Sequence, residues 1–381
     1  MNGKKLNSIF DRRVFLTAAG SIGVISVLAG CGRNGSPGAS GDGSAKKLTI
    51  GCVVPTLDAE FWQRLVPFME SCATTLGVEL VIVNANNSAD ELSRGIDDLV
   101  ARKVDGLIMV PYFGAGPRGI AIADSAGIPS MCIDTTPESI EPGGEFENYI
   151  GFVGPDDETS GYNMAEALAK TMVPGDDGKR KIVAIQGTPG TSVAINRYKG
   201  LQRYIAEKGD LTLQGEAVGN FVATDSQNAM DDLLQRHPDT QGVWCANGGT
   251  AAGAVASIAN AGKQAGKDIK VVTMDLNPDN LDRLETGEIE FDTGGHWLMG
   301  GFALIIMFDW INGKKISDDL RSQTMKLLPV TKASLPQFEI DYPDGQLKYD
   351  VKQHSRVFTP SGPAAVIDLE YSKPVDLDLR P

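Results

Sequence analysis

Residues 78–112, VELVIVNANNSADELSRGIDDLVARKVDGLIMVPY, contain the pattern from which the fold class of this chain follows. The apolar runs VELVIVNA and DGLIMVPY at its two ends predict buried strands. SADELSRGIDDLVARK between them predicts a helix that opens on a capping box, in which Ser88 caps and Glu91 reaches back. A strand, a helix and a second strand in this order predict parallel strands joined by a right-handed crossover.

The same alternation of strand and helix continues on both sides of this segment. Apolar runs predict further strands at residues 48–54, 128–135, 181–187, 211–218, 242–247 and 269–276. Helices are predicted at residues 61–76, 118–127, 157–172, 196–209, 226–237 and 250–262. Strands that are apolar throughout predict sheets covered on both faces. We therefore predict an α/β protein with two doubly wound parallel-sheet lobes.

The C-terminal part of the chain departs from this alternation. TGGHWLMGGFALIIMFDWINGKK (293–315) predicts a helix that is too short and too rich in glycine to span a membrane. FEIDYPDGQLKYDV (338–351) alternates apolar and polar residues around a Pro-Asp-Gly turn, which predicts a β-hairpin. AAVIDLEY (364–371) is a candidate for one more strand. No role for these last segments follows from their sequence.

The N-terminus has the pattern of an export signal. Residues 1–13 are basic, and the apolar run that follows them ends in small residues before Cys31. The ending Leu28-Ala29-Gly30-Cys31 resembles a bacterial lipobox, so we expect Cys31 to carry a lipid. The pair Arg12-Arg13 resembles a twin-arginine signal, and it equally fits the basic start of a general signal.

Residues 32–46 are rich in glycine and serine, which predicts a flexible tether. A tether behind a lipidated cysteine predicts an exported domain in the periplasm or at the outer face of the cytoplasmic membrane. Its contact with the membrane would be made only through Cys31.

Composition and motifs exclude several classes of function. The 381 residues carry a formal net charge of -14, and no cluster of lysine and arginine follows the first residues, which argues against a nucleic-acid partner. His237, His296 and His354 are too scattered for a metal site. The sequence has no GxSxG elbow, zinc motif or phosphate loop. We therefore expect no catalytic residue, no cofactor and no metal.

Four cysteines follow the lipobox, each in an apolar segment: Cys52, Cys72, Cys132 and Cys245. In an exported protein an even number of cysteines allows disulfides. We favour buried, unpaired thiols, because lobes of this size do not need covalent cross-links.

Polar and aromatic residues follow the predicted strands, at the edge where open parallel sheets bind ligands. They include Asp58, Phe61, Trp62, Asp134, Thr135, Arg197, Phe221, Asn247 and Asp275. Carboxylates, amides and a guanidinium can hydrogen-bond sugar hydroxyls, and an aromatic ring can cover the apolar face of a sugar. Three acids against one arginine disfavour an anionic ligand. We expect a neutral sugar or polyol, and a cationic ligand stays open.

From about Lys47 to about Thr331 the chain resembles the ribose-binding group of type I periplasmic solute-binding proteins. The segments that carry the resemblance are PTLDAEFW, NANNSADELSRGIDDLVARKVDGLIMVP, IDT, QGTPGTSVAINRYKG, DLLQRHPDTQGVWCANGGTAAGAV and TMDLNPDN. The resemblance implies two lobes joined by a multi-strand hinge, which close over one sugar and then dock on the membrane permease of an ABC transporter.

The resemblance also implies roles for individual residues. Phe61 and Trp62 match the family's aromatic pair, Asp134 its sugar-binding acid, and Arg197 its clamp arginine. The matches in the second lobe are its aromatic, Phe221, and two polar ligands, Asn247 and Asp275, while His296 falls at the hinge or rim.

Several positions depart from the family pattern. Ala59 stands where ribose binders have an asparagine, and Thr135 stands where they have an arginine. Gly248, followed by Gly249, replaces an acid, and Gly295 replaces a glutamine. These changes imply more room and fewer charges in the pocket, so we expect a ligand other than ribose.

The predicted domains are the signal (1–31), the tether (32–46) and two lobes with a C-terminal extension. The N-terminal lobe is expected at 47–152 plus about 296–326, the C-terminal lobe at 153–295, and a hinge return with an added β-hairpin at 327–381. We expect a monomer. Two alternatives remain: a sensor that presents its ligand to a membrane receptor, and a glycoside-processing enzyme that uses two aspartates as acid and base.

Overall fold

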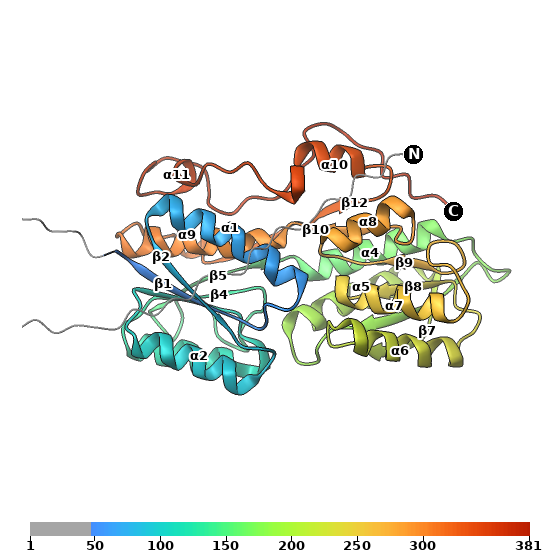
Figure 1. The fold of residues 1–381 in the computed structure, drawn as a ribbon, viewed down its shortest axis with the longest axis horizontal. Coiled ribbons are helices and arrows are strands. Elements are labelled where there is room, and N and C mark those ends of the chain that lie inside the picture. Colours follow the sequence, from blue (N-terminus) through green and yellow to red (C-terminus); the bar gives the residue numbers. More distant parts are fainter. Residues whose placement is uncertain (1–46) are drawn as a thin grey trace, which may run out of the picture. The chain divides into compact units, whose positions relative to one another are not determined.

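The computed structural model describes residues 47–381. The predicted export signal, the lipobox with Cys31 and the predicted tether lie outside these residues. Within residues 47–381 the chain forms two parallel sheets covered by helices and one antiparallel pair of short strands (Figure 1). The predicted α/β class with two parallel-sheet lobes is confirmed.

The first lobe is built on a sheet of six parallel strands. In spatial order they are β11 (Ser322–Met325), β5 (Tyr149–Pro155), β4 (Ser130–Ile133), β3 (Gly106–Met109), β1 (Thr49–Val54) and β2 (Glu79–Asn84). Helices α1 (Glu60–Leu76) and α9 (Met299–Ile311) lie on one side of the sheet, and α2 (Ala89–Ala101) lies on the other with α3 (Ala115–Ser125) packed against it (Figure 1). The central strands are buried on both faces, which explains why they are apolar throughout.

The second lobe is built on a sheet of four parallel strands. In spatial order they are β7 (Leu211–Val218), β6 (Arg180–Gln186), β8 (Gly242–Cys245) and β9 (Lys270–Val272). Its helices are α4 (Asp157–Thr171), α5 (Ser192–Lys208), α6 (Ala223–Arg236), α7 (Gly248–Asn260) and α8 (Pro278–Thr286). Helix α4 packs on α5, and α6 packs on α7.

The described chain passes between the two lobes three times. It leaves β5 for α4, it leaves β10 (Asp292–Gly294) for α9, and it leaves β11 for β12 (Leu328–Val330). β10 and β12 pair with each other as antiparallel strands. A domain boundary at residues 152/153 is not consistent with this arrangement, because β5 belongs to the first sheet as far as Pro155.

The predicted β-hairpin at 338–351 is wrong. These residues belong to α10 (Leu335–Asp341), to a 3-10 turn at Pro343–Gly345 and to α11 (Val351–His354), and residues 364–371 form no strand. Phe338 and Tyr342 stand four residues apart on one side of a helical turn, with ring centroids 5.4 Å from each other. The Tyr342 hydroxyl donates to the Glu370 carbonyl (2.5 Å) and accepts from its N–H (2.8 Å), so a side chain takes the place of a strand partner.

The capping box at Ser88 is confirmed only in part. The Ser88 hydroxyl accepts a hydrogen bond from the Glu91 N–H (3.3 Å), as predicted for an N-cap. The Glu91 carboxylate pairs with Arg94 on the same helix. The elements that were not predicted include β5, α8 and the short strands β10, β11 and β12.

The four described cysteines are buried and unpaired, as favoured from the sequence. Burial raises the pKa of the Cys52 thiol to about 12, so this group acts as a small apolar side chain near neutral pH. Among residues 47–381 no helix combines the length and the apolar character that a membrane span requires.

Candidate functional site

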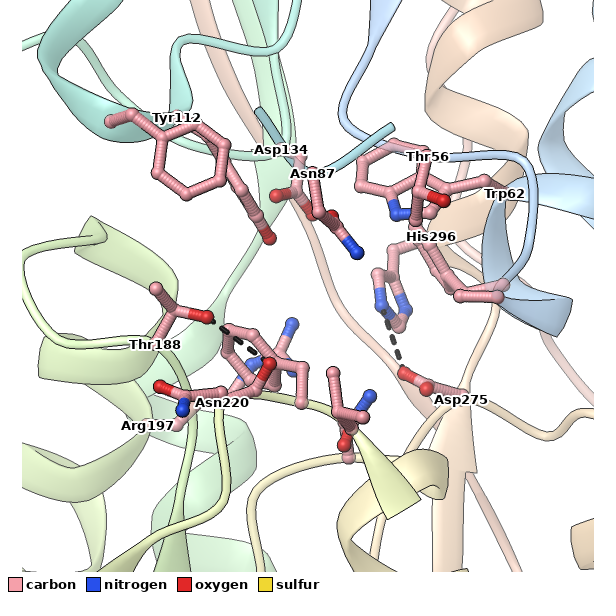
Figure 2. Close-up of a pocket in the computed structure, with 16 residues that line it drawn as sticks. Thr56, Trp62, Asn87, Tyr112, Asp134, Thr188, Arg197, Asn220, Asp275 and His296 are labelled. Atoms are coloured by element: carbon pink, nitrogen blue, oxygen red, sulfur yellow. Dashed lines mark hydrogen bonds and ion pairs between the residues drawn. The ribbon is translucent and has the colours of Figure 1, made fainter. Parts of the chain in front are cut away.

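A cavity of about 280 Å³ lies where the carboxyl ends of the two parallel sheets face each other (Figure 2). Its lining from the first lobe and the hinge is Thr56, Ala59, Phe61, Trp62, Asn87, Tyr112, Phe113, Asp134 and His296. Its lining from the second lobe is Thr188, Arg197, Asn220, Phe221, Val222, Asn247 and Asp275. The structure therefore brings together eight of the ten binding residues expected from the sequence.

Asp58 and Thr135 do not line the cavity, so the structure does not support the roles expected for them. The Asp58 side chain is exposed, and its N–H donates to the Thr56 hydroxyl (3.0 Å), which turns the chain into α1. Thr135 is buried, and its hydroxyl donates to the Asp134 carboxylate (3.2 Å). Thr135 therefore orients a lining residue without reaching the cavity itself.

Phe61 and Trp62 open helix α1, and both reach the cavity. Their rings meet edge to face with centroids 4.9 Å apart, which is a favourable aromatic geometry. Trp62 is 5% exposed and belongs to the core of the first lobe, while Phe61 is only partly buried. The Phe61 ring lies over the His296 ring with centroids 4.6 Å apart. Phe221 supplies an aromatic ring from the second lobe.

Each lobe contributes one buried carboxylate to the cavity. Asp134 follows β4 and is 4% exposed, and burial raises its pKa although the Arg197 charge opposes this. Asp275 follows β9, is also 4% exposed, and accepts a hydrogen bond from the Gly248 N–H (3.1 Å). In Figure 2 Asp134 reaches into the cavity from the first lobe and Asp275 from the second.

His296 stands beside Asp275 at the crossing between the lobes. Its Nε2 lies 3.5 Å from the Asp275 carboxylate, and the ring is 1% exposed (Figure 2). The Nδ1 atom has no hydrogen-bond partner in the structure. Buried polar atoms are rarely left in this state, which makes the setting of Nδ1 unusual.

Arg197 is engaged by the protein itself. Its Nε donates to the Asp157 carboxylate at 2.7 Å, and its Nη1 donates to the Ala246 carbonyl at 2.9 Å. Burial raises the pKa of Asp157 to about 7, and the charge of Arg197 opposes this rise. Asp157 was not among the binding residues expected from the sequence. Its pairing with Arg197 means that the arginine charge at the cavity is already balanced within the protein.

The backbone around the cavity is strained. Six lining residues have a positive φ although none is glycine: Asn87, Phe113, Asp134, Asn220, Phe221 and Asp275. Within residues 47–381 twelve residues other than glycine adopt such angles, so half of them gather at this one place. Each costs on the order of 1–3 kcal/mol and persists only where the surroundings hold it, and such residues cluster at functional sites.

A model of the periplasmic binding protein domain matches residues 50–315 of this chain. The chain belongs to the periplasmic binding protein family. The family confirms the prediction of a binding protein rather than an enzyme. Among residues 47–381 of this periplasmic binding protein, no group of three or more histidine, cysteine, aspartate or glutamate side chains is arranged to hold a metal ion.

Relatives and solved structures agree with this assignment. This periplasmic binding protein is 29% identical over 294 residues to the ribose import binding protein of Bacillus subtilis, covering 75% of this chain and 90% of the relative. It is 27% identical over 277 residues to the xylitol-binding protein of Mycolicibacterium smegmatis, covering 72% of each chain. A periplasmic sugar-binding protein from Pseudomonas fluorescens has the same fold, with a TM-score of 0.72 and 24% identity over 81% of this chain and 94% of the other.

The glycines that depart from the family pattern do not open the cavity, contrary to expectation. A Cβ on Gly248 would lie 2.4 Å from the Asn277 amide nitrogen, and one on Gly249 would lie 2.4 Å from the Phe221 carbonyl oxygen. Gly295 faces Leu369, and no glycine at these positions lines the cavity of this periplasmic binding protein. Protein atoms therefore occupy the space at these glycines, whereas Ala59 does line the cavity.

Sequence reading missed several lining residues, among them Asn87, Tyr112, Phe113 and Asn220. Asn87 and Tyr112 follow β2 and β3, so reading the residues after every strand would have found them. Phe113 and Asn220 reach the cavity through positive φ angles of 56° and 53°. Phenylalanine does not signal such a conformation, whereas asparagine is several-fold enriched in it, so Asn220 offered a weak signal.

Proposed function

We propose that this protein is the substrate-binding lipoprotein of an ABC-type importer and that it captures a neutral sugar or sugar-like polyol between its two lobes. One observation carries the proposal. Carboxylates and aromatic rings from both lobes face a single cavity, while Arg197, the one arginine among residues 47–381 that lines it, is already paired with Asp157. The names of the ribose import and xylitol-binding relatives support the same class of ligand.

The chemistry of the lining fits a ligand with several hydroxyl groups. Each hydroxyl can donate to Asp134 or Asp275 and can accept from the Asn247 amide. The Phe61 and Phe221 rings offer flat apolar surfaces for the C–H face of a sugar. A volume of about 280 Å³ is at the small end of ligand pockets, which favours a ligand of monosaccharide size.

Capture is proposed to work by closure of the lobes. Asp134 and Asp275 sit on different lobes, so a ligand that bonds to both stabilises the closed form over the open one. The closed form would then dock on a membrane permease. The lipid on Cys31, the position outside the cytoplasm and the monomeric state belong to this proposal and rest on the N-terminal sequence and the family.

The ligand is proposed to be a molecule other than ribose. Ala59 lines the cavity at a position where ribose binders have an asparagine, so one amide contact is missing. The Nδ1 atom of His296 has no hydrogen-bond partner in the structure. With Nε2 facing the Asp275 carboxylate as the donor, Nδ1 would be an acceptor, and a ligand hydroxyl would satisfy it.

A thermal-shift screen tests the proposal. Pentoses, hexoses, alditols, inositols and nucleosides would be compared with anionic sugar phosphates. At least one neutral polyol is expected to raise the melting temperature in a concentration-dependent way, because ligand binds the folded state only. The same compound should fail to stabilise an Asp134→Ala variant. Stabilisation by sugar phosphates alone would overturn the account of the cavity charge and with it the proposed ligand class.

A further inference from the structure

Residues 331–381, called the extension below, lie beyond the family match, which ends at residue 315. The extension runs along both lobes on the side of α1, α9 and α8 (Figure 1). On the first lobe the buried Asp309 carboxylate accepts hydrogen bonds from the Ser355 hydroxyl (2.5 Å) and the Arg356 N–H (2.6 Å). On the second lobe α10 packs against α8. The extension is therefore attached to both parts of the molecule.

Arg64 connects the extension with the binding cavity. It lies in α1 two residues after Trp62, yet it does not line the cavity. Its guanidinium donates to the Leu276 carbonyl and also to the Gly345 carbonyl of the extension, the second bond at 3.0 Å. The same group lies 3.6 Å from the centroid of the Trp297 ring. One side chain of the first lobe thus joins the extension to the residue that follows Asp275.

The backbone is strained at Asp275 and Leu276, the loop to which Arg64 donates its hydrogen bond. Asp275 has φ 116° and Leu276 has φ 50°, both in the region that favours glycine. The Leu276 N–H donates to the Asp292 carboxylate (3.2 Å), and the Asp275 N–H donates to the Thr293 carbonyl (2.9 Å). Such angles persist only where surrounding contacts hold them. The bond from Arg64 to the Leu276 carbonyl supplies a further contact, and it comes from the other lobe.

The guanidinium of Arg64 carries its charge near neutral pH although the residue is partly buried. Burial lowers the pKa of Arg64 to about 10, and the carboxylates of Asp292 and Asp275 oppose this. Arg64 therefore stays protonated near neutral pH and can donate to both carbonyls. Arginine presents several donors in a planar fork, which allows one side chain to bond two acceptors at once.

We propose that Arg64 is a positioning residue and that the extension acts through it: the Gly345 carbonyl fixes the guanidinium, the guanidinium fixes Leu276, and the Asp275 carboxylate is thereby held toward the cavity. The effect on affinity rests on the proposed function, whereas the effect on the loop does not. Contacts to the extension would then change ligand affinity although no residue of the extension lines the cavity.

Gly345→Ala is the direct test. Gly345 has φ 65°, and a Cβ there would lie 1.5 Å from Arg64 Nη2, so the guanidinium must leave its place. Gly313→Ala is the matched control, because Gly313 has φ 78° and no atom within 4 Å of its added Cβ. Both variants carry the same kind of backbone strain, and only the first displaces Arg64.

Amide hydrogen exchange on the full chain is the first readout. In Gly345→Ala the amides of Asp275 and Leu276 are expected to exchange about tenfold faster, as for the loss of one hydrogen bond, and in Gly313→Ala they should match the wild type. Arg64→Met should give the same local increase, and adding Gly345→Ala to it should change nothing more. Unchanged exchange of Asp275 and Leu276 in Gly345→Ala, or equal acceleration throughout the chain, would overturn the proposal.

Binding is the second readout, with xylitol and myo-inositol as the probes and isothermal calorimetry as the measurement. The probe that binds the wild type should bind Gly345→Ala about tenfold more weakly and Gly313→Ala equally well, because only the first loses a positioning bond. If Gly345→Ala and the wild type bind the probe with equal affinity, the proposed effect of the extension on ligand affinity is wrong. Absence of binding by the wild type would count against the proposed ligands, while hydrogen exchange still decides whether Arg64 positions the loop.

Discussion

Arg197 and Asp157 form a buried ion pair directly beside the binding cavity. The Arg197 side chain is 4% exposed and the Asp157 side chain 5%, so water cannot replace either partner. Buried pairs of this kind are costly to break, because the remaining charge is left in a poorly solvated place. Arg197 therefore has a structural role in addition to any contact with a ligand.

We predict that Arg197→Ala destabilises the protein by about 3–5 kcal/mol, the usual cost of leaving one buried charge without its partner. The double change Arg197→Met with Asp157→Leu removes both charges and should recover most of that loss. Chemical denaturation of the three proteins measures the effect. If Arg197→Ala is as stable as the wild type, the ion pair contributes nothing to the free energy of unfolding.

Asp292 is a fully buried acid. Burial raises its pKa from 3.8 to about 8, the Asp275 charge adds to the rise, and hydrogen bonds from Asn280 and Leu276 oppose it. The folded protein therefore holds this proton more tightly than the unfolded chain does. Its contribution to stability is full below the unfolded pKa and is lost as the pH rises through about 8.

We predict that the free energy of unfolding falls between about pH 5 and pH 8, by up to about 1.4 kcal/mol per pH unit for each proton involved. Asp157, whose pKa is raised to about 7, acts in the same direction. Asp292→Asn should flatten the slope, and the exposed Asp319→Asn should leave it unchanged. Denaturation curves at several pH values give the slopes. A wild-type stability that rises with pH over this range would contradict the prediction.

Helices α4 and α5 cross at a point where two glycines meet backbone atoms of the partner helix. A Cβ on Gly161 would lie 2.0 Å from the Arg197 carbonyl oxygen, and one on Gly200 would lie 2.1 Å from the Glu158 carbonyl oxygen. Backbone atoms cannot rotate away as side chains can. The close crossing also brings Asp157 of α4 against Arg197 of α5.

We predict that Gly161→Ala destabilises the protein by about 1–3 kcal/mol through overpacking, although alanine is the better helix former. Gly119→Ala in α3 is the control, because its Cβ would meet only side-chain atoms of Met109 and Ile96. Thermal or chemical unfolding of both variants measures the difference. Equal effects of the two substitutions would show that α4 and α5 can move apart at little cost.

Within residues 47–381 the two lobes are connected by three chain crossings and by the extension. The extension contacts both lobes. Asp309 of α9 is the main polar anchor of the extension on the first lobe, since its carboxylate accepts from Ser355, Arg356 and Val357. An alanine at position 309 has no carboxylate oxygens and cannot accept these hydrogen bonds.

We predict that Asp309→Ala loosens the extension and leaves the two sheets intact. Limited trypsin digestion followed by mass spectrometry should show faster cleavage after Lys352 and Arg356, because local opening exposes these sites. Asp318→Ala serves as the control, since that carboxylate is exposed. If cleavage at both sites keeps the wild-type rate, Asp309 does not anchor the extension.

The strands and helices of both lobes could be predicted because their pattern is local. Apolar runs and helical spacing follow directly from burial, and residues after the strands point to the cavity because parallel strands end at a common edge. β5 was missed although it is fully buried, and the hairpin was predicted where α10 and a 3-10 turn form. Tyr342 and Glu370 lie far apart in sequence, and their bonding is a tertiary effect.

By sequence alone, the class of fold, the sheet edge where the cavity lies and most of the aromatic and acidic residues there were determined, because each depends on the order of nearby residues. The partner of Arg197, the free Nδ1 of His296 and the bond from Arg64 to Leu276 depend on segments that meet only after folding. The same holds for Gly248 and Gly295, where packed neighbours fill the space that the sequence left open. The sequence specifies which polar groups are present. The packing of the folded chain determines which of them are left without a hydrogen-bond partner.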